Sequence, residues 1–303
     1  MKKEIRTKAV VAIAALSLIL AFTPLSFATD TKADAPTDEK QKVEGTKQDK
    51  TAEKRKEILE EARAAIRETE NALKALDEKK DKDALAALER ASGKLSIILA
   101  REPELALAPS DVNAVTYDVL GDIDAIKALR EEIEDALDDG RVQQARRLIR
   151  NLASEKVISV TNIPLVTYPD AIKKAVKLID EGKTEEAKEV LQLALNTLVV
   201  TDTIIPLPVV TAENLLKEAE TLAEKADRTE KENNRLAGLL KDARTELEFA
   251  QALGYGSKKD FKNLYKQIDK IEDKTEDGKS GTGFFTKIKE YLKDTVKSSQ
   301  PES

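Results

Sequence analysis

The sequence predicts a predominantly all-α fold, in which duplicated helical hairpins form a compact helical domain. The composition favours long helices, because Ala, Leu, Glu and Lys are abundant and only 4% of the residues are aromatic. Apolar residues recur at three- and four-residue spacing over long stretches, which is typical of amphipathic helices. A helix-turn-helix segment also occurs three times along the chain.

The N-terminus resembles a secretory signal peptide. Basic residues at positions 2, 3, 6 and 8 precede an uncharged apolar run over residues 9–20, and Ser26-Phe27-Ala28 supplies the small residues of a cleavage site. The apolar run is shorter than the roughly 20 residues that span a bilayer. We therefore predict that residues 1–28 are a cleaved signal peptide and that the protein is exported.

The segment that follows, residues 29–50, consists largely of charged and polar residues. It cannot bury enough apolar surface to offset the entropy of ordering, so we predict a disordered acidic and polar linker. Helical periodicity begins near Thr51. We expect a helical-hairpin repeat domain over residues 51–253 and a C-terminal helical segment over residues 254–303.

The three copies of the repeat align on an aspartate that ends the first helix of each copy: Asp77, Asp138 and Asp180. Each copy has an alanine seven residues later and a large aliphatic residue four residues after that. These pairs are Ala84 and Leu88, Ala145 and Ile149, and Ala187 and Leu191. Because the small alanine lets two helices approach closely, each copy is predicted to be an αα-hairpin.

The register of the repeat continues without a gap beyond the hairpins. The aligned positions are Ile97, Ile158 and Val200, followed by Pro103, Pro164 and Pro206. Gly140 and Gly182 lie just past the first helix of two copies, where a left-handed C-cap is favoured, and Thr184 could cap the helix that follows. The copies are unevenly spaced, which favours a compact domain over an open solenoid.

An apolar stretch with flanking prolines follows each hairpin, over residues 103–109, 157–169 and 198–210. Residues with β-branched side chains dominate the last two stretches, which could form a small β ribbon or equally remain extended loops. The stretches are either buried in the core or exposed to partners. The candidate partner-binding residues are Val157, Ile158, Val160, Ile163, Leu165, Val199, Val200, Ile204, Ile205, Leu207 and Val209.

Helices are expected over residues 211–225 and 231–252, and the sequence Ser257-Lys258-Lys259-Asp260 predicts a capping box that opens another helix. The last helix carries four lysines beside Phe284, Phe285 and Ile288. It could contact an anionic membrane, although docking on the core or pairing in an oligomer explains the pattern better.

The composition also restricts the chemistry. The chain has neither histidine nor cysteine, so the commonest general base, the soft metal ligands and the cysteine nucleophile are missing. Cleavage after residue 28 removes four bases and one acid, which changes the net charge from −6 to −9 and argues against nucleic-acid binding. We expect no catalytic, cofactor-binding or metal-binding residues, and hence a protein that is not an enzyme.

Three motifs that suggest a site have simpler explanations. Asp77, Asp81 and Asp83 occupy alternating positions, but this segment lacks the central glycine and final glutamate of a calcium loop, so a turn is predicted. Gly278-Lys279-Ser280-Gly281 lacks the full spacing of a phosphate-binding loop. Adjacent acids such as Asp138 and Asp139 are expected on solvated helix faces.

Several segments together resemble the YfdX family of exported bacterial proteins. They are Ile179 to Lys183 with Glu186-Ala187, Leu198 to Pro208, Leu253-Gly254-Tyr255-Gly256 with Asp260-Phe261-Lys262, and Gly278 to Phe285. The resemblance implies a mostly helical periplasmic protein linked to acid and heat stress, with chaperone-like activity and oligomerisation. It implies no catalytic motif. We therefore expect protein partners, either unfolding clients or further copies of the chain in a homo-oligomer.

The acidic composition suggests a response to acid. The chain without residues 1–28 has 56 acids and 47 bases, so its net charge would reach about +19 near pH 4, where carboxylates are roughly half protonated. We hypothesise that acid loosens an assembly and exposes the proline-flanked stretches. The alternatives are a structural or envelope-associated module without client binding, and a carboxylate-based enzyme, which a pocket lined by several carboxylates would favour.

Overall fold

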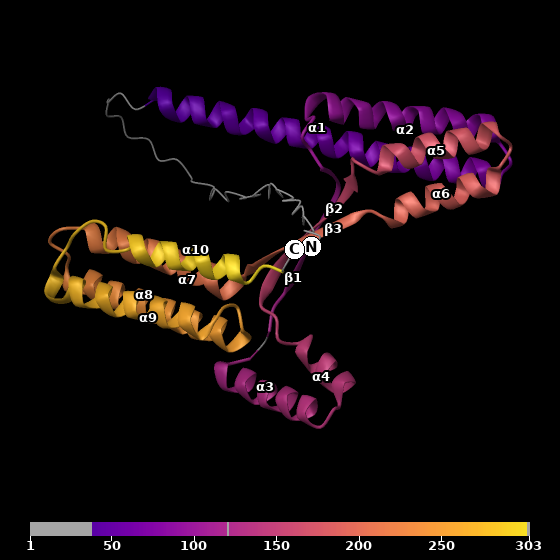
Figure 1. The fold of residues 1–303 in the computed structure, drawn as a ribbon. Helices are drawn as coiled ribbons and strands as arrows, with labels where there is room; N and C mark the ends of the chain where they lie inside the picture. Colours follow the sequence, from indigo (N-terminus) through magenta and orange to yellow (C-terminus); the bar gives the residue numbers. More distant parts are fainter. Residues whose placement is uncertain (1–37, 120, 302–303) are drawn as a thin grey trace, which may run out of the picture. The chain divides into compact units, whose positions relative to one another are not determined.

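A computed structural model describes residues 38–119 and 121–301 of the chain (Figure 1). The predicted signal peptide, residues 1–28, lies outside the described residues, as does the beginning of the predicted linker. The chain divides into two units at residues 49 and 50, within α1.

The predominantly all-α fold is confirmed. The helices are α1 (Asp38–Asp77), α2 (Asp81–Arg101), α3 (Ile123–Asp138), α4 (Val142–Ile149), α5 (Tyr168–Asp180), α6 (Thr184–Asn196), α7 (Leu207–Glu224), α8 (Glu230–Leu253), α9 (Lys258–Thr275) and α10 (Thr286–Ser298), with a 3-10 turn, η1, at Glu276–Gly278. The strands are β1 (Leu107–Tyr117), β2 (Glu155–Pro164) and β3 (Val199–Pro206).

Helix α1 begins earlier than expected. The sequence predicts a disordered linker up to residue 50, but the chain is helical from Asp38. Few residues of this segment are apolar, yet Glu, Gln and Lys have good intrinsic helix propensity and can extend a helix that is already nucleated. The linker prediction is therefore corrected for residues 38–50.

The hairpin repeat has the same turn geometry in all three copies within the described residues. The first helix ends at the repeat aspartate, and the residue two positions later is left-handed, with φ of 57° at Lys79, 71° at Gly140 and 75° at Gly182. The next amide donates to the carbonyl five residues back: Lys80 to Ala75 (2.8 Å), Arg141 to Ala136 (2.7 Å) and Lys183 to Leu178 (2.8 Å). This is the Schellman pattern, so the glycine C-caps are confirmed.

Two expectations about the repeat are wrong. Thr184 is the first residue of α6 and makes no capping hydrogen bond, so it is not the N-cap. The gapless register also fails in the first copy, since α2 remains helical to Arg101 and includes Ile97, whereas the aligned Ile158 and Val200 lie in strands. The sequence of α2 is rich in Ala, Leu and Lys, which favours continuation of the helix.

Each hairpin is followed by a strand, and the strands of the described chain form one antiparallel sheet in the order β1-β2-β3. The small β ribbon is thus confirmed, and the extended-loop alternative is wrong. Its first strand starts only at Leu107, near the end of the predicted stretch 103–109, and continues to Tyr117. Helix α7 begins at Leu207 rather than near Thr211, because Pro208 is well tolerated in a first helical turn.

The buried side chains form separate hydrophobic clusters. One joins α1, α2, α5 and α6 with one end of the sheet, a second joins α7, α8, α9 and α10, and a small third lies within the α3–α4 hairpin. The domain boundary at residues 253/254 stays a prediction. The apolar side chains of α10, among them Ile288 and Leu292, are buried in the second cluster, so the face considered for membrane contact packs on the protein.

Candidate partner-binding surface

The two faces of the sheet differ in charge. Residues paired across antiparallel strands share a face, and successive rows alternate between faces. The pairing of Val112 with Val160 and of Ala114 with Ile158 therefore puts these four side chains on one face. Val199 and Ile205, opposite Asn162 and Lys156, lie on the same face. We call the set Val112, Ala114, Ile158, Val160, Val199 and Ile205 the valine face.

The valine face combines apolar character with exposure. Val112 is 47% exposed and Val199 37% exposed, whereas Ile158 at the centre is buried. Within the sheet, Lys156 is the only charged residue on this face, while the opposite face carries Asp111, Glu155 and Asp202. The valine face thus offers an apolar surface that a polypeptide could cover.

The eleven predicted residues are divided by the fold. Ile158, Val160, Val199 and Ile205 lie on the valine face, and Val157, Ile163, Val200 and Ile204 lie on the opposite face. Leu165 follows β2, and Leu207 and Val209 belong to α7. Ile163, Leu165 and Val209 are buried in the clusters and are not accessible to partners.

Residues of β1 were missed by the sequence prediction. Val112, Val115 and Tyr117 are all exposed apolar side chains of this strand. The prediction ended at Pro109 because the residues beyond it are mostly polar and small. The alternation of polar and apolar residues in Asp111-Val112-Asn113-Ala114 was the signal that could have identified the strand.

The outer edge of β3 is partly closed by Gln300, which lies two residues after the end of α10. The Gln300 side chain accepts a hydrogen bond from the Ile204 amide (3.0 Å) and donates one to the Ile204 carbonyl (2.8 Å). It therefore replaces a neighbouring strand at one position. Exposed edge strands are templates for additional strands, and β1 and β3 are the two edge strands of this sheet.

Tyr255, in the turn between α8 and α9, fixes the start of β2. Its buried hydroxyl accepts a hydrogen bond from the Ser154 amide (2.8 Å), and the Ser154 hydroxyl donates to Asp118 (2.8 Å). Burial, with the nearby Glu155 carboxylate, raises the pKa of the Tyr255 phenol, so the hydroxyl stays protonated. These contacts connect the C-terminal helices to the sheet.

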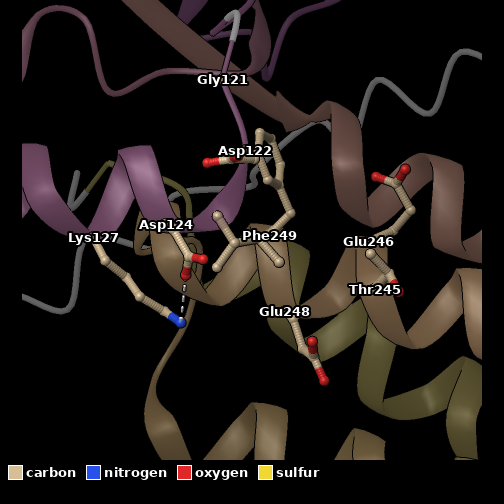
Figure 2. A pocket seen from close by; sticks show the side chains of 9 residues that line it. Gly121, Asp122, Asp124, Lys127, Thr245, Glu246, Glu248 and Phe249 are labelled. Carbon is tan, nitrogen blue, oxygen red and sulfur yellow. Dashed lines mark ion pairs between the residues drawn. The ribbon is translucent and has the colours of Figure 1, made fainter.

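A hollow of about 560 Å³ lies between the N-terminus of α3 and helix α8 (Figure 2). Its lining includes four carboxylates, from Asp122, Asp124, Glu246 and Glu248. The carboxylate of Asp122 accepts the Ala125 amide as an N-cap (2.8 Å). Asp124 pairs with Lys127 at 3.6 Å, and Figure 2 shows the carboxylates of Asp124, Glu246 and Glu248 pointing in different directions. These carboxylates do not converge on one point, whereas the two members of an acid–base pair must do so.

Glu246 is the half-buried carboxyl of this hollow on α8. Burial raises its pKa above the usual range, and the negative charges of Asp118 and Asp242 act in the same direction. Within residues 38–119 and 121–301, no group of three or more acidic side chains is arranged to hold a metal ion. The described helices also include none that is both long and apolar enough to cross a membrane.

A family model described as YfdX protein matches residues 65–204. The matched range starts in α1 and ends in β3, so it includes the hairpins and the sheet. The resemblance inferred from the sequence is thereby confirmed over this range, and it extends to the first hairpin. The Leu253–Gly256 turn and the Gly278–Phe285 run lie outside the match.

Among solved structures, a crystal form of YfdX from Salmonella Typhi is similar to 48% of this chain and to 90% of its own chain. The identity is 14% and the TM-score 0.34. No curated protein matches it.

Proposed function

The chain belongs to the YfdX family over residues 65–204, and from this membership we propose that it is a chaperone-like, stress-associated binding protein of the periplasm. In this proposal it binds unfolding proteins and performs no catalysis. The signal-like N-terminus supports export.

The valine face is the observation that carries this proposal. Apolar side chains in a small sheet are normally covered by helices or a second sheet. Here Val112 and Val199 remain accessible on a face with little charge. An unfolding client exposes apolar side chains and unpaired backbone groups, so it can cover this face or add a strand at an edge.

Self-association is a second part of the proposal. Copies of the chain form a homo-oligomer at neutral pH, and acid loosens this assembly as carboxylates lose their charge. The excess of acids over bases supports a strong change of net charge near pH 4. Loosening would increase the accessible apolar surface when client proteins unfold.

Heat-induced aggregation of a client protein, measured by light scattering with and without this protein, tests client binding. The wild type should suppress aggregation, and Val112→Asp combined with Val199→Asp should weaken suppression because clients would have to desolvate two carboxylates. Leu193→Asp is the matched control, since Leu193 is exposed on α6 outside the sheet. Absence of suppression by the wild type would favour a structural module, and full suppression by the double variant would contradict the role of the valine face.

An enzyme is the second candidate, and it rests on the raised pKa of Glu246 in the hollow of Figure 2, since the carboxylates that line this hollow do not converge. Glu246, with its raised pKa, would be the proton donor. An enzymatic activity that is lost in Glu246→Gln and kept in Glu248→Gln would favour this candidate over the binding protein.

A further inference from the structure

The α3–α4 hairpin exposes residues that the other two hairpins bury. Leu137 is 47% exposed, although the aligned Leu76 and Ile179 are only 2% and 4% exposed. Ile149 is 49% exposed, although the aligned Leu88 and Leu191 are fully buried. Because the repeat positions are the same, the difference arises from what covers each hairpin.

In the other two copies, the cover is a second hairpin. Helix α2 contacts α5, and both hairpins contribute to one hydrophobic cluster that includes Leu76, Leu88, Ile179 and Leu191. The Lys188 ammonium of α6 pairs with the Asp77 carboxylate at the end of α1, at 2.6 Å. Within the described residues, no second repeat hairpin packs on the α3–α4 hairpin; α3 contacts α8 instead. The cluster of the α3–α4 hairpin contains only Ile133, Ala136 and Ala145 as buried members.

The packing of these two hairpins is reciprocal. The second helix of the first hairpin, α2, meets the first helix of the other, α5, and the second helix of that hairpin, α6, meets the end of α1. A unit that packs reciprocally on an equivalent unit can also pack on an identical one, about a two-fold axis. The same arrangement of two α3–α4 hairpins would place α4 of each copy on α3 of the other.

The charges of α3 and α4 fit this arrangement. The end of α3 is acidic and α4 is basic. Within the described residues, the acids Glu131, Glu132, Asp135 and Asp138 and the bases Arg146, Arg147 and Arg150 make no ion pair. Contact of α3 with α4 of a second copy would pair opposite charges on both sides of the axis.

The repeat also identifies one specific pair. Lys188 lies eight residues after the repeat aspartate Asp180, and Arg146 lies eight residues after Asp138. The intrachain pair Asp77–Lys188 thus corresponds to a pair between Asp138 of one copy and Arg146 of another. Elsewhere on α3, Arg130 donates to the Ala252 carbonyl at the end of α8 (3.0 Å), which leaves Leu137 and Ile149 available.

We propose that two copies of the chain associate through their α3–α4 hairpins, with Leu137 and Ile149 at the contact and Asp138 of each copy paired with Arg146 of the other. This interface rests on the proposed self-association and gives it a location. It is separate from the valine face. Because opposite charges of α3 and α4 meet at the interface between the two copies, added salt should weaken the association.

Sedimentation equilibrium of the purified protein at pH 7 tests the interface. Asp138→Arg and Arg146→Asp should each weaken self-association by about tenfold or more, because like charges would then face each other. The two variants mixed together, and the double variant alone, should associate about as tightly as the wild type, because opposite charges then meet again. Asp180→Arg is the matched control at the same repeat position, and it should leave self-association unchanged.

Circular dichroism of each single variant identifies a folding defect, and the mixing experiment remains decisive even if one variant is less stable. A monomeric wild type, single variants that associate like the wild type, or variants that fail to associate when mixed would each overturn the interface. Aggregation suppression, measured in parallel, separates the two proposals. A wild type that self-associates as proposed but does not suppress aggregation would contradict client binding and leave the interface in place.

Discussion

At the scale of single residues, Arg228 joins three segments of the C-terminal helices. Its guanidinium donates to the carbonyls of Leu222 and Ala223 (both 3.1 Å) at the end of α7. It also donates to Thr275 (3.2 Å) at the end of α9 and to Lys279 (2.8 Å). The residue is 8% exposed. A cation at two helix C-termini satisfies carbonyls that have no intrahelical partner and opposes the helix dipoles.

We predict that Arg228→Lys lowers the free energy of unfolding by about 2 kcal/mol, because an ammonium cannot reach carbonyls on both sides and leaves some unsatisfied. Urea denaturation measures this change. Arg235→Lys, which alters an exposed pair with Glu218, should have almost no effect. Equal midpoints for the two variants would contradict the role assigned to Arg228.

Glu246 makes the stability depend on pH. Its pKa is raised in the folded protein, first by burial and then by Asp118 and Asp242. A carboxyl with a raised pKa lowers the free energy of unfolding once it ionises. This loss of stability therefore appears as the pH rises through the range in which carboxyls titrate. Glu246→Gln should therefore raise the melting temperature at pH 7, and the gain should disappear as the pH falls below that range.

Thermal unfolding from pH 7 to pH 3 measures this dependence. Glu248→Gln, on the same helix at an exposed position, is the control and should shift the melting temperature little at any pH. A gain from Glu246→Gln that persists at low pH would show that the cause is packing rather than ionisation.

At the scale of elements, the turn between α8 and α9 depends on glycine. Gly254 ends α8 in a left-handed conformation with φ of 90°, and Gly256 has φ of 151°. A Cβ atom at residue 256 would lie 3.1 Å from Thr295 Cγ2 and 3.2 Å from Phe261 Cε2. The turn therefore requires both an unusual backbone and a close approach of α10.

We predict that Gly256→Ala destabilises the protein by roughly 1–3 kcal/mol, from backbone strain and this crowding. Gly93→Ala is the matched control, because Gly93 lies within α2 and a Cβ atom there meets no other atom within 4 Å. It should be neutral or stabilising by up to about 1 kcal/mol. Denaturant midpoints compare the two, and the same sign for both would contradict this explanation.

The elements also differ in how far the sequence predicts them. The hairpin turns were predicted correctly, because the aspartate, the glycine at the C-cap and the alanine of the second helix are local signals. Strand β1 and the extent of α2 were not, because the choice between helix and strand there depends on pairing with β2. The exposure of Leu137 and Ile149 could not be predicted, since their aligned counterparts are buried by a distant hairpin.

The candidate surface was predicted in part. The sequence identified the segments that became β2 and β3, but it could not assign Ile163 to the core and Val199 to the surface. That division depends on which helices cover which end of the sheet. The two missing members, Val112 and Ala114, lie in the strand that the sequence did not identify.

At the scale of the whole molecule, the carboxylates do not all respond to acid at the same pH. The pKa of Glu232 is lowered to about 2, first by its ion pair with Lys225 and then by hydrogen bonds from Thr229. The pKa of Glu181 is also lowered, chiefly by Lys183. Stability from such groups is present above the unfolded pKa and is lost only as the pH falls towards the lowered value. Glu232 and Glu181 therefore contribute little to a response near pH 4.

We predict that the oligomer dissociates and that binding of a hydrophobic dye increases as the pH falls from 7 to 4. The change should be concentrated in the carboxyl range, because the chain has no histidine to titrate between pH 5 and 8. Light scattering and dye fluorescence measure the two effects. A transition centred near pH 6.5, or none at all, would contradict an acid response based on carboxylates.

The central claim is that unfolding proteins bind at the valine face. A photo-crosslinking residue at position 112 tests it most directly, with position 193, an exposed apolar site on α6, as the reference. With a heat-denatured client present, crosslinks should form at position 112 and be rare at position 193, and a folded client should give few at either. Equal crosslinking at the two positions, or none at position 112 while aggregation is suppressed, would contradict the claim.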